Sequence, residues 1–374
     1  MLQTLSETHS QIAPAPRLEI VPTISLRLAE RPADRPADAP SENRAGPEER
    51  CYNRAKQLLQ RWGCGSISYM TLKAENKLFV EQKGTAYLAY RCRLGVAVTV
   101  GDPVGSPEGI RRCVQQFVNF CEQQGWIPVF FVVEEPLPLY RKLGLKSLQV
   151  AEDAYLDLQF LEFKGKHWQD VRTALNRAKR EGLTFHQLEP RQASPELLQQ
   201  IRQISLEWLA TKTTNRKLSE IGFLLGSLKT ITDPAVRTYY ALDKQNQVQG
   251  FVSWVPRAGA QGWALDLMRR RNNAMPGLMD FLIASSALQF KAEGYISLGL
   301  GAAPLAPVQR QRSLSTTEEA VYWLKPYIEG FYGFSSLYAF KQKFRPEWKP
   351  LFTFYPAGSN WLRIGVALSL IVLN

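Results

Sequence analysis

Apolar and polar positions in residues 51–162 follow patterns that predict a mixed α/β lobe. The segments "TAYLAYR" and "VAVTVGDP" have the composition of strands, and apolar residues between Ile110 and Cys121 recur at helical spacing. The apolar run "WIPVFFVV" indicates a buried strand, and "PLPLYRKLGL" indicates a short helix that ends at Gly144. A strand pair, a helix, a strand and a helix in this order are typical of an α/β lobe.

Residues 163–356 repeat this plan and predict a second lobe. Two helices, Trp168–Glu181 and Pro195–Leu209, lead into the strands "RTYYAL", "VQGFVSWV" and "GWALDLM". A helix over Pro276–Glu293 and the strand "YISLGL" follow. The similar element order predicts a tandem α/β duplication, with mixed sheets flanked by helices.

The two ends of the chain differ from these lobes. Residues 1–50 are rich in proline, lack aromatic residues and contain "RPADRPAD", which predicts a disordered leader. Residues 357–374 form an apolar segment that includes "NWLRIGVALSLIVLN". As a helix this stretch would be about 21 Å long, shorter than a bilayer core of about 30 Å. It is either a helix in a membrane interface or a last core strand or helix.

Composition and net charge limit the classes of partner that we expect. The 374 residues suit two domains, and 45% hydrophobic with 21% charged residues is typical of a globular protein. A net charge of +12 indicates a polyanionic partner, nucleic acid or an anionic membrane surface, although a merely soluble basic protein is the alternative. The five cysteines form no CxxC pair and the three histidines are scattered, so we expect reduced thiols and no metal site.

Asp266 stands out in the predicted strand "GWALDLM". Strand alternation places it on one face with Ala264 and Met268, and an unpaired carboxylate on a covered face is costly. Arg269 and Arg270 follow, but in a regular strand Arg269 points to the opposite face from Asp266. For both to serve one site the strand must bulge or end near Met268. The alternative is a structural ion pair at a strand end.

The helix Trp168–Glu181 carries a polar face with Arg172, Asn176, Lys179 and Arg180. Together with lysines immediately upstream it could hold phosphates, although a charged face is often only solvated. A second candidate anion-binding position is at Pro276 and Gly277, where a loop leads into the N-terminus of a helix. Acyl-CoA transferases bind the pyrophosphate of coenzyme A at such a position with a loop rich in glycine. The segment "RRRNNAMPG" has a single glycine, so it supports a coenzyme A site only weakly.

The aromatic-rich segment "FYGFSSLYAFKQKFRPEWKPLFTFYP" contains Lys341 and Lys343. Most of its aromatic residues are expected in the core rather than as base-stacking platforms. The two lysines lie about 200° apart on a helix, so only one of them can face a given site. The chain lacks a GxSxG elbow, a Walker loop and a Cys/His dyad. Hydrolysis by a familiar nucleophile and ATP-dependent chemistry are therefore not expected.

The order of motifs resembles the cytosolic synthase domain of the bacterial aminoacyl-phosphatidylglycerol synthases, the multiple peptide resistance factor family. The similar pieces are "GDPVG", "LYRKLG", "VRTALNRAKREG", "GFVSWVP", "LDLMRR", "MPGLMDFL", "LGLGAAPLA" and "FYGFSSLYAFKQKFRPEW", spread over about residues 60–356. The resemblance implies tandem acyltransferase-like (GNAT-like) lobes, with a tunnel between them for aminoacyl-tRNA and phosphatidylglycerol. It implies transfer of an amino acid, lysine or alanine, to a glycerol hydroxyl, without ATP or another cofactor.

The resemblance also implies site residues. Asp266 and Arg269 of "DLMR" are carried over, with Lys341 or Lys343, and spacing favours Lys343. In this hypothesis Asp266 anchors the ammonium of the aminoacyl group, while Arg269 and a lysine hold a phosphate or the developing oxyanion. The family also has a site glutamate upstream of its aromatic motif. The corresponding residue here is Glu329, which lies closer to "FYGF" than the family spacing implies.

Further substrate contacts are expected from Arg270 and from the basic helix through Arg172, Asn176 and Arg177, which would meet tRNA or anionic lipid. Many family members carry an N-terminal multi-span flippase that this chain lacks, so a separate flippase is an expected partner. The expected location is cytoplasmic, peripheral on the inner face of the bacterial membrane. The alternatives are an aminoacyl or acyl-CoA transferase with another acceptor, and a non-catalytic tRNA-binding or membrane-binding protein.

Overall fold

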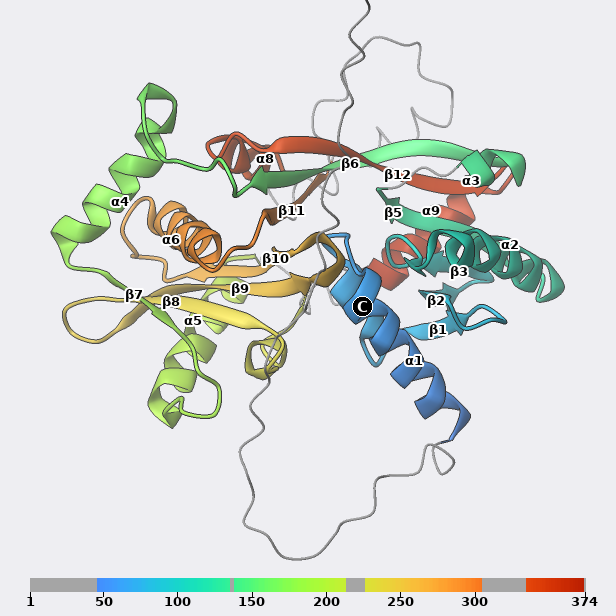
Figure 1. Ribbon diagram of the computed structural model, residues 1–374, viewed down its shortest axis with the longest axis horizontal. Helices are drawn as coiled ribbons and strands as arrows, with labels where there is room; N and C mark the ends of the chain where they lie inside the picture. Colours follow the sequence, from blue (N-terminus) through green and yellow to red (C-terminus); the bar gives the residue numbers. More distant parts are fainter. Residues whose placement is uncertain (1–45, 135–137, 213–225, 305–333, 373–374) are drawn as a thin grey trace, which may run out of the picture. The chain divides into compact units, whose positions relative to one another are not determined.

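The strands of the described residues form one mixed sheet of twelve strands (Figure 1). We describe a computed structural model that covers residues 46–134, 138–212, 226–304 and 334–372. The sheet order is β1-β2-β3-β5-β12-β6-β11-β10-β9-β8-β7, with β4 paired to β2. The strands are β1 (Lys77–Val80), β2 (Ala86–Arg93), β3 (Val96–Thr99), β4 (Val104–Gly105), β5 (Ile127–Val133), β6 (Leu145–Asp157), β7 (Thr184–Gln187), β8 (Arg237–Leu242), β9 (Val248–Arg257), β10 (Gly262–Arg270), β11 (Ser297–Pro304) and β12 (Glu347–Pro356).

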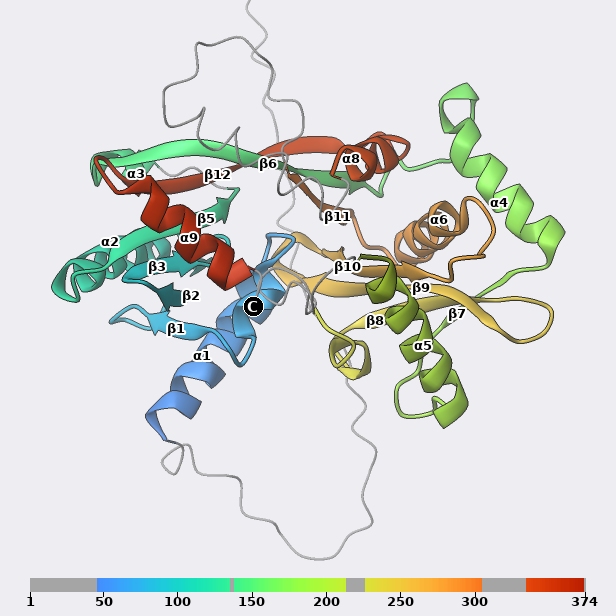
Figure 2. The same cartoon turned by 180° about the vertical axis from the view of Figure 1, so that it is seen from behind.

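Helices cover both faces of this sheet (Figures 1 and 2). They are α1 (Pro47–Trp62), α2 (Pro107–Gln123), α3 (Pro138–Lys142), α4 (Gln169–Glu181), α5 (Pro195–Lys212), α6 (Leu278–Ala292), α8 (Phe334–Gln342) and α9 (Trp361–Val372). Four short 3₁₀ turns complete the described elements: η2 (Ser68–Leu72), η3 (Lys166–Trp168), η4 (Thr230–Thr232) and η5 (Ala258–Ala260).

The side chains of β2 alternate between the two faces of the sheet and pack against a helix on each face. Leu88 and Tyr90 pack against the apolar face of α2, whereas Ala89 packs with Ile364 and Ala367 of α9. Successive residues of a strand point to opposite faces, so α2 and α9 cover opposite sides of the same strand. The apolar run of α9 is therefore partly a core helix.

The strands β8, β9 and β10 are covered in the same way by α6 on one side and α5 on the other. Trp254 of β9 donates a hydrogen bond from Nε1 to Ser286 Oγ of α6 at 3.2 Å. Phe251 of β9 packs with Ile201 and Ile204 of α5. These two helices determine which face of β10 each side chain can reach.

The position of β12 connects early and late parts of the chain. It lies between β5 and β6 and pairs antiparallel with both. Its residues belong to the predicted second lobe, whereas β5 and β6 belong to the predicted first lobe. The boundary at residue 162 stays a prediction, since the sheet continues across it without a break.

The predicted fold class is confirmed as α/β, with a large mixed sheet flanked by helices. The helix predicted over Ile110–Cys121 is α2, which Ser106 caps by accepting a hydrogen bond from the Gly109 amide. The basic helix ends as expected at Gly182, whose φ of 75° is the left-handed conformation that glycine adopts easily. Helix α1 begins at Pro47, inside the predicted leader, and residues 1–45 lie outside the described residues.

Candidate functional site

A β-bulge in β10 places Asp266. Leu265 is opposite Trp254 of β9, and Met268 is opposite Val252, so β10 has one extra residue at this point. Leu265 and Met268 pack against the α6 core, whereas Leu267 packs against the α5 core. The bulge thereby resets the alternation of the strand, and the predicted break before Met268 is confirmed.

Ser253 stabilises the bulge from the neighbouring strand. Its buried hydroxyl accepts a hydrogen bond from the Leu267 amide at 3.0 Å and lies 3.5 Å from Asp266 Oδ2. A bulge removes a regular ladder partner, and a side-chain hydroxyl can replace it. Ser253 was not identified from the sequence, because a serine in an apolar strand carries no distinctive signal.

Asp266 is 7% exposed and accepts several hydrogen bonds. The Gly226 amide donates to Oδ1 at 2.5 Å, and Thr230 Oγ1 donates to Oδ2 at 3.4 Å. A Cβ at Gly226 would lie 2.0 Å from Oδ2, so this contact requires glycine. Burial raises the pKa of Asp266, while the Gly226 amide, Lys73 and Arg269 oppose the rise.

Arg269 lies on the same side of β10 as Asp266. Its guanidinium is 5.0 Å from the ring centre of Trp208 on α5, and the residue is 3% exposed. Its positive charge also stabilises ionised Asp266. The structure thus brings Asp266 and Arg269 to one face, with Lys73 as a further cation that sequence reasoning missed.

Lys341 reaches the neighbouring strand from α8. Its Nζ donates hydrogen bonds to the carbonyls of Gly301 at 2.7 Å and Ala302 at 2.8 Å. A Cβ at Gly301 would lie 3.7 Å from both Lys341 Nζ and the Leu265 carbonyl oxygen, so the ammonium and the backbone of the residue before Asp266 lie on the same side of Gly301. Burial lowers the pKa of Lys341 to about 8, while Asp153 opposes the change.

Lys341 reaches the carbonyls of β11 at the point where β10 and β11 separate. Their parallel pairing runs from Gly262 opposite Ser297 to Ala264 opposite Gly299. Beyond Gly299, β11 continues beside β6, with a register shift before Gly301. The carbonyls of residues 301 and 302 are therefore available to the lysine instead of to a β10 partner.

Asp153 of β6 forms a buried polar network next to Lys341. Its carboxylate accepts hydrogen bonds from Ser66 Oγ and from Tyr155 OH, the latter at 2.9 Å. Tyr155 OH also contacts Glu134 Oε2 at 2.6 Å. Burial raises the pKa of Asp153, against the effect of Ser66 and Lys341. Sequence reasoning missed Asp153, although a carboxylate in the apolar alternation "VAEDAYLDL" is the same kind of signal as Asp266.

Lys343 lies in different surroundings from Lys341. Its Nζ is 3.0 Å from Asp280 Oδ1 near the start of α6. The expected divergence of the two lysines is therefore confirmed: Lys341 contacts β11, whereas Lys343 pairs with α6. Which of the two belongs to the site stays a prediction.

A cavity of about 340 Å³ lies beside Lys343. It is lined by Asp170, Thr173, Ala174, Arg177, Pro276, Gly277, Asp280 and Lys343. Gly277 has a φ of 89°, and a Cβ there would lie 2.9 Å from Ala174 Cβ, so α4 packs closely against this turn. The loop and helix start that were expected to bind an anion thus line a cavity in which cations and carboxylates are mixed.

The other predicted substrate contacts are distributed around this cavity and the surface. Arg177 lines the cavity and donates from Nη1 to the Pro276 carbonyl at 3.4 Å. Arg172 donates to the Gly165 carbonyl, and Asn176 is exposed on α4. Arg270 is exposed and donates to the Arg271 carbonyl, away from Asp266. Glu329 lies outside the described residues.

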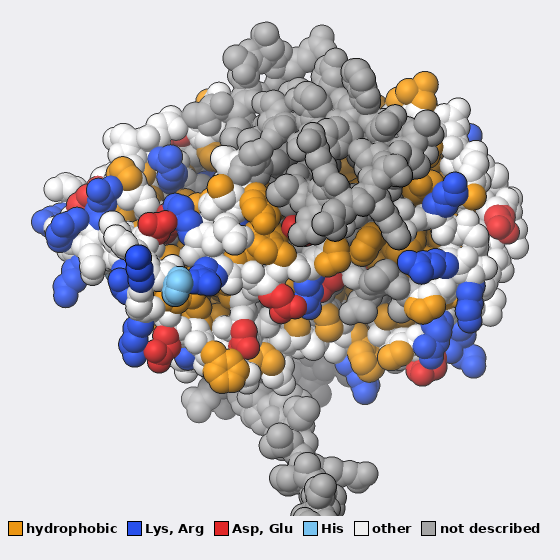
Figure 3. Space-filling view, turned by 90° about the horizontal axis from the view of Figure 1, so that it is seen from above, with side chains coloured by type: hydrophobic (Ala, Val, Ile, Leu, Met, Phe, Trp, Pro, Cys, Tyr) orange, Lys and Arg blue, Asp and Glu red, His pale blue; other side chains and the backbone are white. Residues whose placement is uncertain are grey.

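Basic side chains gather over α4. In the view from above, Lys and Arg side chains are dense at the end of the sheet that α4 covers in Figure 1 (Figure 3). Lys179 and Arg180 are exposed on this helix, and Lys164 and Lys166 precede it. This end of the protein is a positively charged surface.

Metal-binding clusters and membrane-spanning helices are both absent from the described residues. Within residues 46–134, 138–212, 226–304 and 334–372, His, Cys, Asp and Glu side chains form no group of three or more that could hold a metal ion. In the same ranges no helix has the length and apolar character needed to cross a bilayer.

Solved structures share this fold. The L-PGS structure from Bacillus licheniformis is 25% identical, with a TM-score of 0.74, and the match covers 86% of this chain and 96% of that one. The mixed α/β sheet therefore belongs to a class of folds that includes L-PGS.

The family follows from the sequence comparisons. The model of the family described as phosphatidylglycerol lysyltransferase, C-terminal, matches residues 56–355, and the chain belongs to this family. An uncharacterised protein of Corynebacterium glutamicum is 32% identical over 324 residues, and the phosphatidylglycerol lysyltransferase of Bacillus subtilis is 30% identical over 303. The matches cover 84% and 81% of this chain but only 40% and 35% of these relatives.

Proposed function

We propose that the chain is an aminoacyltransferase that moves an amino acid, lysine or alanine, from aminoacyl-tRNA to the glycerol hydroxyl of phosphatidylglycerol. The observation that carries the proposal is the β10 bulge, which brings buried Asp266 and Arg269 to one face, with Lys341 at the adjacent strand. Membership of the phosphatidylglycerol lysyltransferase family supports the choice of acceptor.

In this proposal Asp266 binds the α-ammonium of the aminoacyl group. A buried carboxylate whose pKa is raised by burial gains most from a cationic ligand, because the ligand restores the charge compensation that water would give. The Gly226 amide and the Thr230 hydroxyl hold the carboxylate in place, so its position is defined before the substrate binds.

Lys341 and Arg269 are proposed to stabilise negative charge. The glycerol oxygen forms a bond to the ester carbonyl carbon, the bond to the ribose oxygen of tRNA breaks, and the glycerol proton ends on that ribose oxygen. The carbonyl oxygen becomes an oxyanion during this exchange, and a fixed ammonium in a buried site stabilises it strongly. The carbonyls of Gly301 and Ala302 hold the Lys341 ammonium in position.

The basic surface of α4 is proposed to contact the tRNA backbone. Exposed Lys179 and Arg180 are suited to phosphate groups, and Arg177 lies at the cavity beside this helix. We further propose a cytoplasmic location at the inner face of the membrane, with a separate flippase where the product must cross the bilayer. An ester exchange of this kind requires neither ATP nor a cofactor.

The test uses the purified full chain with tRNA charged with labelled lysine or alanine and with phosphatidylglycerol vesicles. Labelled aminoacyl lipid is the expected product, and Asp266→Asn is expected to lower its rate of formation by about 10²-fold or more. The matched control is Glu81→Gln, which also changes a buried carboxylate to an amide but lies outside the site. It should keep the rate per folded molecule.

Further arms of the assay separate the alternatives. Acetyl-CoA with amine acceptors tests an acyl-CoA transferase, and neither acetylated amine nor free coenzyme A should form there. Lack of aminoacyl lipid with every charged tRNA tried would reject the proposal, as would an Asp266→Asn variant with the wild-type rate.

A further inference from the structure

Helix α9 has two apolar faces, of which the sheet covers only one. Ile364, Ala367 and Ile371 are buried in the core formed with β2 and β3. Leu362, Val366 and Leu370 recur every fourth residue on another side and are 78%, 43% and 40% exposed. Residues four apart share one face of a helix, so these three side chains form a continuous exposed stripe.

The β2–β3 turn lies beside the start of α9. Arg363 donates from Nε to the Leu94 carbonyl at 2.6 Å, which fixes the start of α9 against this turn. The Leu94 side chain is itself 54% exposed. We call Leu94, Leu362, Val366 and Leu370 together the α9 surface.

Cations border the α9 surface. Arg363 follows Leu362 in the chain, and Arg93 precedes Leu94; both are exposed. Burial raises the pKa of the Cys92 thiol, and the positive charges of Lys77, Arg93 and Arg363 oppose the rise, so all three cations act on this part of β2.

From this arrangement we propose that the α9 surface docks on an anionic lipid bilayer. An apolar helical stripe bordered by cations inserts its side chains among acyl chains and places its charges at the phosphate groups. The helix has 12 residues, about 18 Å in length, so it lies in the interface and does not cross the bilayer. A second copy of the chain fits less well, because symmetric pairing would bring the same arginines close together.

The proposal deepens the proposed function, since it supplies the surface through which a transferase would reach a membrane lipid. It rests on that function only for the identity of the lipid. The α9 surface belongs to the half of the sheet formed by β2 and β3, whereas the basic α4 packs against α6 over β8–β10. The two polyanions, lipid and tRNA, would therefore bind to different parts of the protein.

The first experiment measures flotation of the full chain with vesicles and without tRNA. Binding is expected with vesicles of phosphatidylglycerol and phosphatidylcholine and to be at least about 10-fold weaker with phosphatidylcholine alone. The double variant Leu362→Ser/Val366→Ser should bind the anionic vesicles about 10-fold or more weakly, because two apolar side chains no longer enter the bilayer.

A matched double variant, Leu206→Ser/Leu288→Ser, removes two leucines that are 53% and 43% exposed on α5 and α6. It should bind the vesicles as the wild type does. Equal binding by both double variants would overturn the proposal. So would a dimer, detected by light scattering, that only the α9 variant abolishes.

A second experiment separates this surface from the catalytic proposal. Transfer is measured with phosphatidylglycerol in vesicles and with short-chain phosphatidylglycerol below its micelle concentration. The Leu362→Ser/Val366→Ser variant should lose transfer to vesicles and keep transfer to the monomeric lipid. If the wild type transfers to neither lipid, the proposed function fails, while flotation still decides whether the α9 surface binds a bilayer.

Discussion

Lys341 and Lys343 have the same side chain but differ in burial and in their contacts. Lys341 is 3% exposed and is held by two carbonyls of β11, whereas Lys343 forms a partly exposed ion pair with Asp280. Burial lowers the pKa of Lys341 to about 8, while the negative charge of Asp153 opposes the change. Its protonation therefore changes near physiological pH.

This pKa leads to a prediction for the pH dependence of transfer. If the Lys341 ammonium stabilises the oxyanion, the catalysed rate should fall as pH rises through about 8, because the charged form is lost. Lys341→Arg should be slower at pH 7 but should lack this decline, since arginine stays protonated. The measurement is the initial rate from pH 6 to 9, corrected for spontaneous hydrolysis of the aminoacyl-tRNA.

Lys343→Arg is the matched comparison, because it makes the same change two residues away. It should keep the decline near pH 8. Identical pH profiles for the wild type and Lys341→Arg would show that another group titrates.

At the scale of the element, the bulge in β10 decides whether Asp266 and Arg269 can act together. Without the extra residue, a spacing of three would place them on opposite faces of the strand. With it, Asp266 and Leu267 both face α5, and Arg269 follows on the same side. Ser253 is the side chain that compensates the interrupted ladder.

Substitution of Ser253 tests this dependence. Ser253→Ala removes the acceptor of the buried Leu267 amide, which should cost about 1–3 kcal/mol of unfolding free energy. The rate per folded molecule should also fall by at least about 10-fold, because the bulge no longer holds Asp266. Denaturant unfolding and the transfer assay measure the two effects.

Ser286→Ala provides a control of equal burial. Ser286 accepts the Trp254 indole hydrogen bond on the α6 side, so its loss should destabilise the fold to a similar extent. Its transfer rate per folded molecule should stay near that of the wild type. Full activity in Ser253→Ala would mean that the bulge is stable without the hydroxyl.

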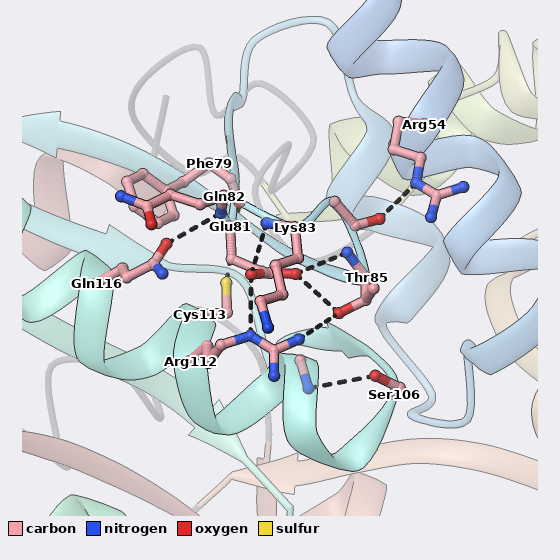
Figure 4. Close-up of polar contacts among 12 residues, drawn as sticks. Arg54, Phe79, Glu81, Gln82, Lys83, Thr85, Ser106, Arg112, Cys113 and Gln116 are labelled. Carbon is pink, nitrogen blue, oxygen red and sulfur yellow. Dashed lines mark hydrogen bonds and ion pairs between the residues drawn. The ribbon is translucent and has the colours of Figure 1, made fainter.

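For the molecule as a whole, the free energy of unfolding at low pH depends on contacts between elements that are distant in the sequence, and Glu81 makes such contacts. Glu81 follows β1 and binds the turn before β2 to α2 (Figure 4). Its carboxylate accepts hydrogen bonds from the Lys83 and Thr85 amides, from Thr85 Oγ1 and from Arg112 Nε. Burial alone would raise the pKa of Glu81, but these donors lower it from 4.5 to about 2.

The sign of this shift determines when the stabilisation is lost. Because the folded pKa is lower than the unfolded one, ionised Glu81 stabilises the fold above pH 4.5, and the effect disappears as pH falls from 4.5 to about 2. The shift corresponds to at most about 3 kcal/mol. Glu81→Gln should therefore lower the unfolding free energy by about 2–3 kcal/mol at pH 7, with a smaller difference near pH 3.

Glu108→Gln is the control for this measurement. Glu108 pairs with Arg111 on the exposed side of α2, and such pairs contribute little, so the expected change is below about 0.5 kcal/mol. A difference between wild type and Glu81→Gln that does not vary with pH would contradict the assignment to an ionised carboxylate.

Several elements follow directly from local sequence. The apolar spacing from Ile110 to Cys121 predicts α2, and the final glycine of the basic helix predicts the end of α4. The strand β12 was not predicted, because Pro350 and a dense aromatic content do not indicate a central strand. Its pairing with both β5 and β6 depends on residues far away in the chain.

The candidate site, like the fold, could be predicted only in part from the sequence. The sequence alone indicates that Asp266 is an unusual carboxylate in a buried strand and that a bulge is required for Arg269 to join it, because side-chain alternation is a local property. Three features are visible only in the folded protein: Lys341 contacts β11, Asp153 acts on Lys341, and α9 exposes a second apolar face. These outcomes depend on which distant segments pack together, and packing is set by the whole sheet.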